Sequence, residues 1–487
     1  MKKLILILTA AIMAVSCSDN LEDLNENVKD PSSVSGESLF ASAQKQLADQ
    51  VVTPNVNLNN LRLWTQQLQE TTYTDESRYN QVTRSIPDNH WRVFYRDVLK
   101  DLDEASKIIE GTTYLTDELN GRKPNKQAIV EVLTVYAYSN LVETYGDIPY
   151  SEALDIDNLL PKYDDAQTVY YDLLARLDVA INTMNTSLNS FENSEDLMYS
   201  GNVAKWKMFA NSLKLRMGIM IADENAALSK STVESAYTSG VFASNADNAT
   251  YKYRNAAPNN NPMNNNLVLS GRNDYVAGAT IIDMMNALED PRRPAYFTDV
   301  DGVYVGGVIG SRSSYATHSH VSDRIVNPSE PGVIMSYDEV EFLLAEAAER
   351  GYAVGGNAES HYIAAITASF DFWNVGDVAS YLAKPEVDYA SAIAASTSTP
   401  KWKMVIGTQA WLGLYNRSFA SYLSVRRLDY PILVEPTSAQ SGYPVRYTYP
   451  VGEQTLNGTN YDAAASAIGG DAPETQLFWD KFYTFDF

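Results

Sequence analysis

Cysteine and histidine are scarce in this chain of 487 residues, which has one cysteine and four histidines. The single cysteine, Cys17, allows neither an internal disulfide nor a metal site built from several cysteines. A globular chain of this length needs no disulfide because its hydrophobic core is large enough to stabilise it. Its composition, 45% hydrophobic and 20% charged, is that of an ordinary globular protein.

Positive charge is also in short supply. The chain has 37 Lys and Arg residues against 61 Asp and Glu residues, which gives a formal net charge of −24. Nucleic-acid binding and attraction to anionic lipid head groups both rely on a cationic surface, so the composition argues against both functions. An acidic surface is neutral toward uncharged ligands such as glycans.

The chain has no hydrophobic run long enough to span a bilayer, which takes about 20 apolar residues. A short apolar run at residues 4–15 follows Lys2 and Lys3, which is the layout of a secretory signal. The residues Ala14-Val15-Ser16 then lead into Cys17, at the cleavage position of a lipoprotein signal. An ordinary signal peptide with an incidental cysteine is the alternative. Because this is the only cysteine of the chain, its position favours lipidation.

This N-terminal pattern divides the chain into three predicted parts. We expect a lipoprotein signal peptide at residues 1–16, a lipid on Cys17 within a flexible acidic tether at 17–31, and a single folded unit at 32–487. The tether is too polar to bury enough apolar surface to fold by itself. Acidic residues after a lipidated cysteine also resemble the export signal of surface lipoproteins in the Bacteroidetes. The predicted location is therefore the outer membrane, with the protein lipid-anchored and facing the cell surface.

Helical periodicity dominates the body of the chain. Apolar side chains recur every three or four residues over 126–146, 165–184 and 203–224. These helices follow one another at intervals slightly above the roughly 34-residue period of tetratricopeptide repeats. We therefore predict tetratricopeptide-like helices near 124–224.

A further helix pair is predicted on either side of Gly351, over residues 335–374. Ser336 and Glu339 have the spacing of a capping box, in which the serine side chain contributes about 0.5–2 kcal/mol as the N-cap. A second helix begins near Asn357. The predicted fold class is mainly α, a tetratricopeptide-like helical repeat scaffold with an irregular, loop-rich ligand-binding portion and a few short strands.

Three stretches, near 50–90, 240–330 and 375–460, lack this periodicity, and we predict that they form the loop-rich portion. An asparagine-rich run at 258–266 has no hydrophobic period, and residues 302–310 alternate small and β-branched residues as in a short hairpin. Loops carried on a rigid scaffold are where proteins usually meet their ligands.

The sequence matches no catalytic template: it has no Gly-x-Ser-x-Gly, His-Glu-x-x-His, phosphate-loop or dinucleotide motif. His318 and His320, with Asp323 nearby, are compatible with a metal but are more typical of solvated surface. Asp299 to Gly302 resembles part of a calcium loop but lacks the distal glutamate. We predict neither enzyme activity nor a metal or cofactor. Paired carboxylates for glycoside hydrolysis stay open, because their separation is spatial.

Tyrosine is abundant, with 32 residues against 14 Phe and 7 Trp. Amphipathic aromatic rings suit stacking on sugars, although those at helical spacing belong to the core. Aromatic side chains in the loop-rich stretches are the better candidates for ligand contacts, together with their polar neighbours. The candidate aromatic residues are Trp64, Tyr73, Tyr79, Tyr275 and Tyr315, and the candidate polar residues are Arg78, Asn80, Arg272 and Asn273.

Several segments together resemble the SusD/RagB family of outer-membrane nutrient-binding lipoproteins, specifically its SusD-like subgroup. The segments that carry the resemblance are 144–153, 162–164, 210–217, 335–340, 344–348, 350–352, the helix ending at Trp373, Arg426-Arg427, Tyr449-Pro450, Glu453, 469–471 and Trp479-Asp480. The resemblance implies four tetratricopeptide-like units packed against an irregular ligand-binding portion. It also implies a SusC-like, TonB-dependent outer-membrane barrel as partner, which the lipoprotein covers as a lid. No ligand residue carries over from the family, because its ligand contacts lie in variable loops.

The main functional hypothesis is a lipoprotein that binds a nutrient, in particular a glycan or oligosaccharide, and delivers it to the barrel transporter. A surface glycoside hydrolase and a peptide- or glycopeptide-binding lipoprotein of the same fold are the alternatives. A purely structural adhesin would have no pocket for a small ligand.

The first testable prediction concerns the anchor. Changing Cys17→Ala removes the thiol that would be acylated, so the protein should leave the membrane fraction on cell fractionation. Mass spectrometry of the wild-type protein should find lipid on a mature chain beginning at Cys17. A wild-type chain without lipid that still sediments with membranes would contradict the prediction.

Overall fold

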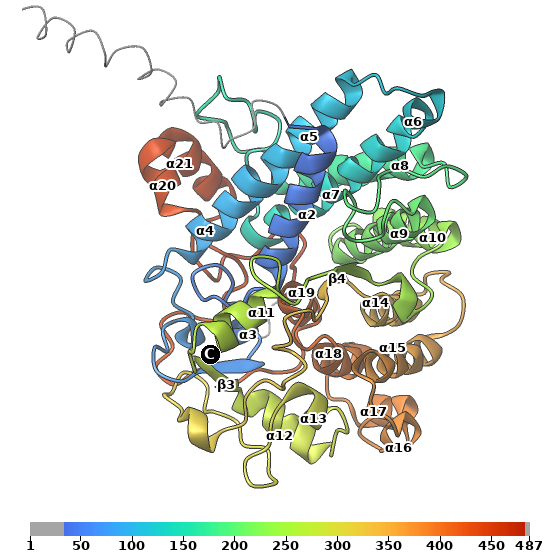
Figure 1. Cartoon of the computed structure of the whole chain (residues 1–487). Helices are drawn as coiled ribbons and strands as arrows, with labels where there is room; N and C mark the ends of the chain where they lie inside the picture. The colour runs from blue at the N-terminus through green and yellow to red at the C-terminus, as the bar shows by residue number, and fades with distance from the viewer. Residues whose placement is uncertain (1–33, 483–487) are drawn as a thin grey trace, which may run out of the picture. The chain divides into compact units, whose positions relative to one another are not determined.

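Paired helices form the scaffold of the folded unit that begins at Gly36. The computed structural model describes residues 34–482, so Cys17, the signal peptide and the tether lie outside the described residues. The helices that pack most closely in pairs are α2 (Gly36–Val52) with α5 (Lys100–Gly111), α7 (Lys123–Tyr145) with α8 (Ala166–Thr183), α9 (Val203–Met220) with α10 (Ala226–Ser239), and α14 (Tyr337–Glu349) with α15 (Ala358–Trp373) (Figure 1). The predicted mainly α fold class is confirmed.

Helix α8 shows how the sequence specifies these elements. The Asp165 side chain accepts a hydrogen bond from the Thr168 backbone N–H at 2.8 Å, which caps the first turn. Val169, Leu173 and Leu177 are buried on one side of the helix. The predicted limits, 165–184, therefore agree closely with the observed helix.

Other helices differ from the prediction. Helices α2, α5 and α10 were not predicted, and in α10 the buried positions include only small or polar residues beside Val233, so its periodicity is weak. The stretch 375–460 was predicted to be loop-rich but contains α18 (Lys401–Gly413) and α19 (Ser418–Leu428). Both helices are buried on nearly all sides, so they lack the one-sided apolar pattern on which the prediction relied.

The start of α14 corrects the predicted capping box. The Ser336 hydroxyl makes no capping bond to the helix; it donates to Asp338 Oδ1 at 2.5 Å and accepts from Arg417 Nη1 at 2.8 Å. The Glu339 carboxylate does accept the Ser336 backbone N–H, so half of the box forms. Arg417 also forms an ion pair with Asp338, in a place where both side chains are buried. The Ser336 hydroxyl therefore bonds to the buried Arg417–Asp338 ion pair instead of capping the helix.

Two short antiparallel ladders lie beside the helices. Strand β1 (Leu68–Glu70) pairs with β3 (Tyr275–Ala277), and β2 (Ala249–Tyr251) pairs with β4 (Gly332–Met335). The predicted hairpin at 302–310 is reduced to an isolated bridge between Val300 and Val303, while Gly307 bridges to Gly278 beside β3.

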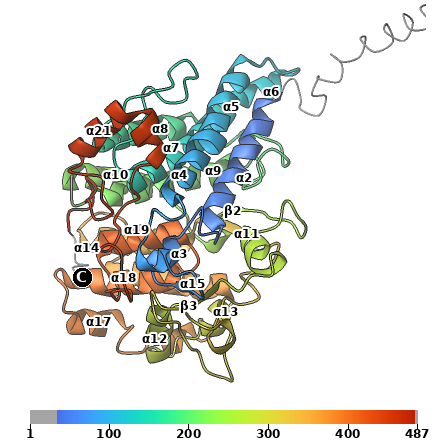
Figure 2. The same ribbon diagram turned by 90° about the vertical axis from the view of Figure 1, so that its left-hand side faces the viewer.

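Shorter elements and loops complete the unit, and Figure 2 shows α12, α13 and β3 at the opposite end from α5 and α7. The remaining helices are α3 (Leu61–Trp64), α4 (Ile86–Arg92), α6 (Asp117–Gly121), α11 (Pro262–Asn264), α12 (Ala279–Ala287), α13 (Arg293–Tyr296), α16 (Val378–Leu382), α17 (Tyr389–Ala395), α20 (Val451–Leu456) and α21 (Gly458–Ala467). Short 3-10 or π turns occur at η1 (Glu76–Arg78), η2 (Val93–Leu99), η3 (Asn245–Asp247), η4 (Asn265–Leu269) and η5 (Tyr315–Thr317). Among residues 34–482, no helix has the length and apolar character needed to cross a membrane.

The second prediction tests the buried ion pair at α14. Asp338→Asn keeps the shape of the side chain but leaves the Arg417 guanidinium buried without its counter-charge, which should lower the free energy of unfolding by about 3–5 kcal/mol. Denaturant unfolding followed by circular dichroism measures this loss. The exposed pair of Lys107 with Asp103 serves as control, because Lys107→Gln should cost less than about 1 kcal/mol. Equal losses in the two variants would contradict the account.

Candidate functional site

Three segments far apart in sequence meet at the outer end of the β1–β3 ladder. The Thr71 backbone N–H donates to the Asp274 carbonyl at 2.9 Å, and the Ser313 N–H donates to the Thr71 carbonyl at 3.1 Å. Arg312 Nε donates to the Thr72 carbonyl at 3.2 Å. The chain after β1, the turn before β3 and the loop before η5 therefore form one surface.

A fourth segment joins this surface from the C-terminal half. Arg78 Nε donates to the Gly310 carbonyl at 2.8 Å, while the Arg78 carbonyl accepts the Gln440 N–H at 2.8 Å. Asn80 Nδ2 donates to Gln440 Oε1 at 2.5 Å. We call the combined surface the loop face; it consists of residues 71–84, 271–275, 310–320 and 436–441.

Six of the nine sequence-predicted ligand residues lie on the loop face with at least part of the side chain exposed. They are Tyr73, Arg78, Asn80, Arg272, Asn273 and Tyr315. Tyr73 is the most accessible aromatic residue among them, with 70% of its surface exposed. Asn273 is next to the Tyr73 loop in space as well, because its carbonyl accepts the Thr71 hydroxyl at 2.7 Å.

The other three predicted residues are buried, and their assignment as ligand contacts is corrected. The Trp64 ring packs against the Tyr447 ring with centroids 5.1 Å apart. Gln66 Nε2 donates to the Tyr79 hydroxyl at 2.9 Å. The Tyr275 hydroxyl donates to the Pro54 backbone carbonyl at 2.6 Å, and both tyrosines are buried. Aromatic residues in irregular segments were predicted to be exposed, but these segments pack inward and use them as core.

Arg84 is a residue of the loop face that sequence analysis missed. Its guanidinium carbon lies 6.0 Å from the centroid of the Tyr73 ring, and its Nε lies 2.8 Å from Glu76 Oε1. Glu76 therefore holds the arginine beside the exposed ring. No motif marks this arrangement in the sequence, because Tyr73 and Arg84 meet only through the fold of the loop between them.

A buried pair of carboxyl groups supports the same loop. Glu70, at the end of β1, and Glu76 are hydrogen-bonded to each other and are 4% and 0% exposed. Glu70 Oε2 also accepts the Ser77 backbone N–H at 3.0 Å and the Ser77 hydroxyl at 2.9 Å. Burial first, and then the hydrogen bond and negative charge of Glu76, raise the pKa of Glu70 to about 9.

Protonated Glu70 can thus donate to Glu76 at neutral pH, and this bond ties the two ends of the Tyr73 loop together. Three other charged or titratable groups surround the pair. Arg84 faces Glu76, while Tyr275 lies opposite Glu70 in the ladder and is followed outward by Asp274. The pair is a positioning device, since neither carboxyl group reaches the surface.

Tyr315 forms a second aromatic element of the loop face. Its ring stacks on the His320 ring with centroids 4.1 Å apart and an interplanar angle of 25°. His318 Nδ1 lies 2.9 Å from the Ser314 carbonyl, so both histidines have contacts within the loop. Within residues 34–482, no three His, Cys, Asp or Glu side chains gather as metal ligands.

A hollow of about 350 Å³ lies next to His320. Its lining includes Thr298, Asp299, Tyr304 and Arg324. The His320 backbone N–H donates to the Thr298 hydroxyl at 3.2 Å, which joins the hollow to the Tyr315–His320 stack. The loop face and the adjoining hollow thus offer both aromatic faces and polar edges. These are the two kinds of contact that hydroxyl-rich ligands use.

Comparison with known proteins identifies the family. A family model described as "Starch-binding associating with outer membrane" matches residues 28–450. The chain belongs to the SusD-like family. No curated protein matches it.

Solved structures agree with the SusD-like assignment. A SusD homolog from Bacteroides uniformis is 29% identical and superposes with a TM-score of 0.74. The match covers 91% of this chain and 99% of that chain. A chitin-binding protein is 25% identical, with a TM-score of 0.77 and coverage of 92% and 100%. A chitin-binding SusD homolog from Flavobacterium johnsoniae shares the fold at 24% identity, with a TM-score of 0.77 and coverage of 91% and 98%. The SusD-like resemblance expected from the sequence is confirmed.

The third prediction concerns Glu70 and pH. Folding raises the pKa of Glu70 from the unfolded value of about 4.3 to about 9. Its contribution to the free energy of unfolding is therefore fully present below about pH 4.3 and is lost as the pH rises to about 9. Glu70→Gln keeps an amide donor toward Glu76 and cannot ionise. The variant should therefore become progressively more stable relative to the wild type between pH 5 and pH 9, by at most about 1.4 kcal/mol per pH unit.

Denaturant unfolding at several pH values measures this difference. Val82→Ala, at an exposed position of the same loop that carries no titrating group, is the control and should follow the wild-type pH profile. A constant difference between wild type and Glu70→Gln across this range would show that Glu70 is already ionised at neutral pH.

Proposed function

We propose that this SusD-like protein is a non-catalytic, lipid-anchored outer-membrane protein that binds a glycan on its loop face. It would deliver that glycan to a TonB-dependent, SusC-like barrel in the same membrane. The observation that carries the proposal is the exposed Tyr73 ring, held beside Arg84 by a buried carboxyl pair. A rigidly supported and exposed ring costs little conformational entropy when a ligand stacks on it.

The chemistry of the loop face suits a sugar. Tyr73 and Tyr315 offer flat apolar faces, and the exposed Arg272 and Asn273 side chains offer hydrogen-bonding edges. A net charge of −24 disfavours acidic polymers and leaves neutral glycans unaffected. The starch-binding description of the family and the chitin-binding names of two structural neighbours point to the same class of ligand.

A glycoside hydrolase remains the alternative with a clear structural requirement. It needs two carboxyl groups on either side of the scissile bond, both in contact with the substrate. Glu70 and Glu76, the carboxyl pair beneath the Tyr73 loop, are buried and hydrogen-bonded to each other. They therefore cannot both contact a substrate. A peptide or glycopeptide would use the same aromatic faces, and the binding assay below separates these ligands.

Attachment to the membrane and to a partner rests on the family and on the N-terminal sequence. The family description places its members in association with the outer membrane. In this chain a lipid on Cys17 would provide the attachment. A shared membrane and a transporter in contact with the protein would raise the local concentration of a weakly bound glycan at the transporter.

The fourth prediction tests the loop face. Tyr73→Ala removes the exposed ring and should weaken binding of a starch or chitin oligosaccharide by at least about 1 kcal/mol, or roughly fivefold. Isothermal titration calorimetry measures the change, with a peptide series titrated in parallel. Tyr461→Ala, on α21 and away from the loop face, is the control and should bind as the wild type does.

Two results would count against the proposal. Unchanged affinity of Tyr73→Ala for every oligosaccharide bound by the wild type would remove the loop face as the binding site. Release of reducing sugar during incubation with these oligosaccharides would replace binding by hydrolysis.

A further inference from the structure

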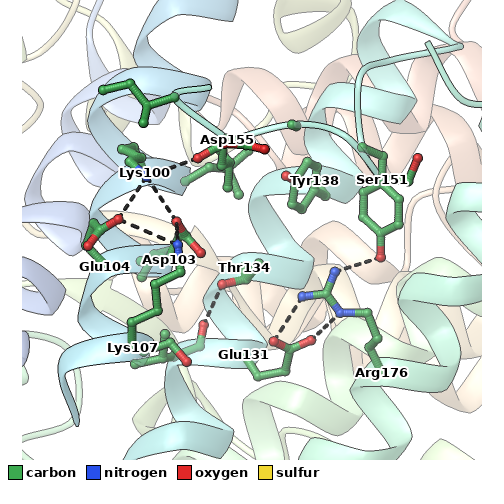
Figure 3. Close-up of a pocket in the computed structure, with 18 residues that line it drawn as sticks. Lys100, Asp103, Glu104, Lys107, Glu131, Thr134, Tyr138, Ser151, Asp155 and Arg176 are labelled. Atoms are coloured by element: carbon green, nitrogen blue, oxygen red, sulfur yellow. Dashed lines mark hydrogen bonds and ion pairs between the residues drawn. The ribbon is translucent and has the colours of Figure 1, made fainter. Parts of the chain in front are cut away.

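A second cavity lies on the helical scaffold, between α5, α7, α8 and the loop that follows α7. Its volume is about 580 Å³, within the range of roughly 300–1,000 Å³ that small-molecule sites occupy. Figures 1 and 2 place α5 and α7 at the opposite end of the folded unit from β3, so the cavity is separate from the loop face. Figure 3 shows the side chains around it.

The hydroxyl group of Tyr138 is the unusual feature of this cavity. Tyr138 lies on α7, is only 3% exposed and belongs to the cavity wall. Its hydroxyl points toward the cavity (Figure 3). Burial raises the pKa of Tyr138, so the group remains a neutral donor and acceptor. A ligand hydroxyl in the cavity can exchange a hydrogen bond with this group.

The cations that line the cavity are already paired. Arg176 donates to both carboxylate oxygens of Glu131, at 2.5 and 3.0 Å, and to the Tyr150 hydroxyl at 2.6 Å. Such a bidentate pair leaves the guanidinium little capacity for a carboxylate or phosphate of a ligand. It also fixes Tyr150, whose ring meets the Tyr138 ring edge-on at 4.9 Å.

The two lysines of the rim are paired in the same way. Lys100 Nζ donates to Glu104 at 2.8 Å, to Asp103 at 3.2 Å and to the Leu154 carbonyl at 3.0 Å, and Lys107 Nζ donates to Asp103 at 2.7 Å. The three cations of the wall face the four carboxylates of Asp103, Glu104, Glu131 and Asp155, so the wall carries no surplus of positive charge. An anionic ligand is therefore disfavoured.

The cavity groups that are free to contact a ligand suit an uncharged ligand rich in hydroxyl groups. Carboxylate oxygens such as those of Glu104 and Asp155 accept hydrogen bonds from hydroxyls, and the Tyr138 hydroxyl both donates and accepts. Leu99, Leu102 and Val130 supply an apolar part of the wall. Apolar surface next to hydroxyl and carboxylate groups matches the two surfaces of a sugar ring.

We propose that this scaffold cavity is a second carbohydrate site, which holds a short neutral saccharide against Tyr138 and Tyr150 independently of the loop face. The two sites lie on different ends of one folded unit, so one polysaccharide chain or two chains can engage both. Engagement at two sites strengthens binding of long glycans relative to short ones, because the second contact is intramolecular.

The experiment uses calorimetric titration of maltotriose and of N,N′,N″-triacetylchitotriose into the whole mature protein. The starting variant is Tyr73→Ala, which weakens the loop face. On this background Tyr138→Phe, which removes only the hydroxyl, should weaken the remaining binding about tenfold, as expected for one lost hydrogen bond. Thr134→Trp, which places a large ring in the cavity, should abolish it. Tyr171→Phe, a hydroxyl deletion on α8 outside the cavity, should change nothing.

Thermal unfolding of each variant verifies that it is folded before titration. Remaining binding that is insensitive to both Tyr138→Phe and Thr134→Trp would overturn the proposal. It would also be overturned if neither saccharide bound to the Tyr73→Ala protein. If Tyr73→Ala alone removes all binding, the loop-face function stands and the second site fails. If only the cavity variants lose binding, the second site stands and the loop face fails.

Discussion

Buried arginine side chains hold the separate parts of this fold in register. Arg417 pairs with Asp338 and Arg427 pairs with Glu346, so the start of α19 and its end are both tied to α14. Arg426 donates from α19 to a backbone carbonyl at the end of α7 and to the C-terminal segment. Each arginine is costly to bury alone, and removing one partner of such a pair typically costs about 3–5 kcal/mol. The arrangement therefore favours one packing of the helices over its alternatives.

The loop face depends on this frame through α3 and β1. Arg62 on α3 donates to the Asn416 side chain at 2.8 Å, directly before the arginine that pairs with α14. Strand β1 follows α3 and ends at Glu70, whose bond to Glu76 closes the loop that carries Tyr73. A flexible loop would lose affinity through the entropy of ordering it, whereas this one is ordered before a ligand arrives. The irregular portion is thus a supported surface rather than a mobile one.

Local sequence pattern was enough to predict the helices that are buried on one side, such as α8. The overall SusD-like fold was predicted from the resemblance of several segments to that family. Local pattern failed for α18, because a helix buried on nearly all sides has no polar face to set its period. It also misplaced Trp64, since irregular backbone can be buried as deeply as a helix when its polar groups are paired. The contact of Arg84 with Tyr73 and the pairing of Glu70 with Glu76 depend on the path of the loop, which no periodicity encodes.

Hydrogen–deuterium exchange with and without a bound starch or chitin oligosaccharide tests the central claim most directly. The account predicts that the oligosaccharide slows exchange in the segments 71–84, 271–275 and 310–320 of the loop face, while the core of α14 and α19 is unaffected. Because β1, the carboxyl pair and the buried arginines hold these segments in place beforehand, their exchange should already be slow for loops in the free protein. Rapid exchange of the free loop face, or ligand protection confined to segments outside it and outside the scaffold cavity, would contradict the account.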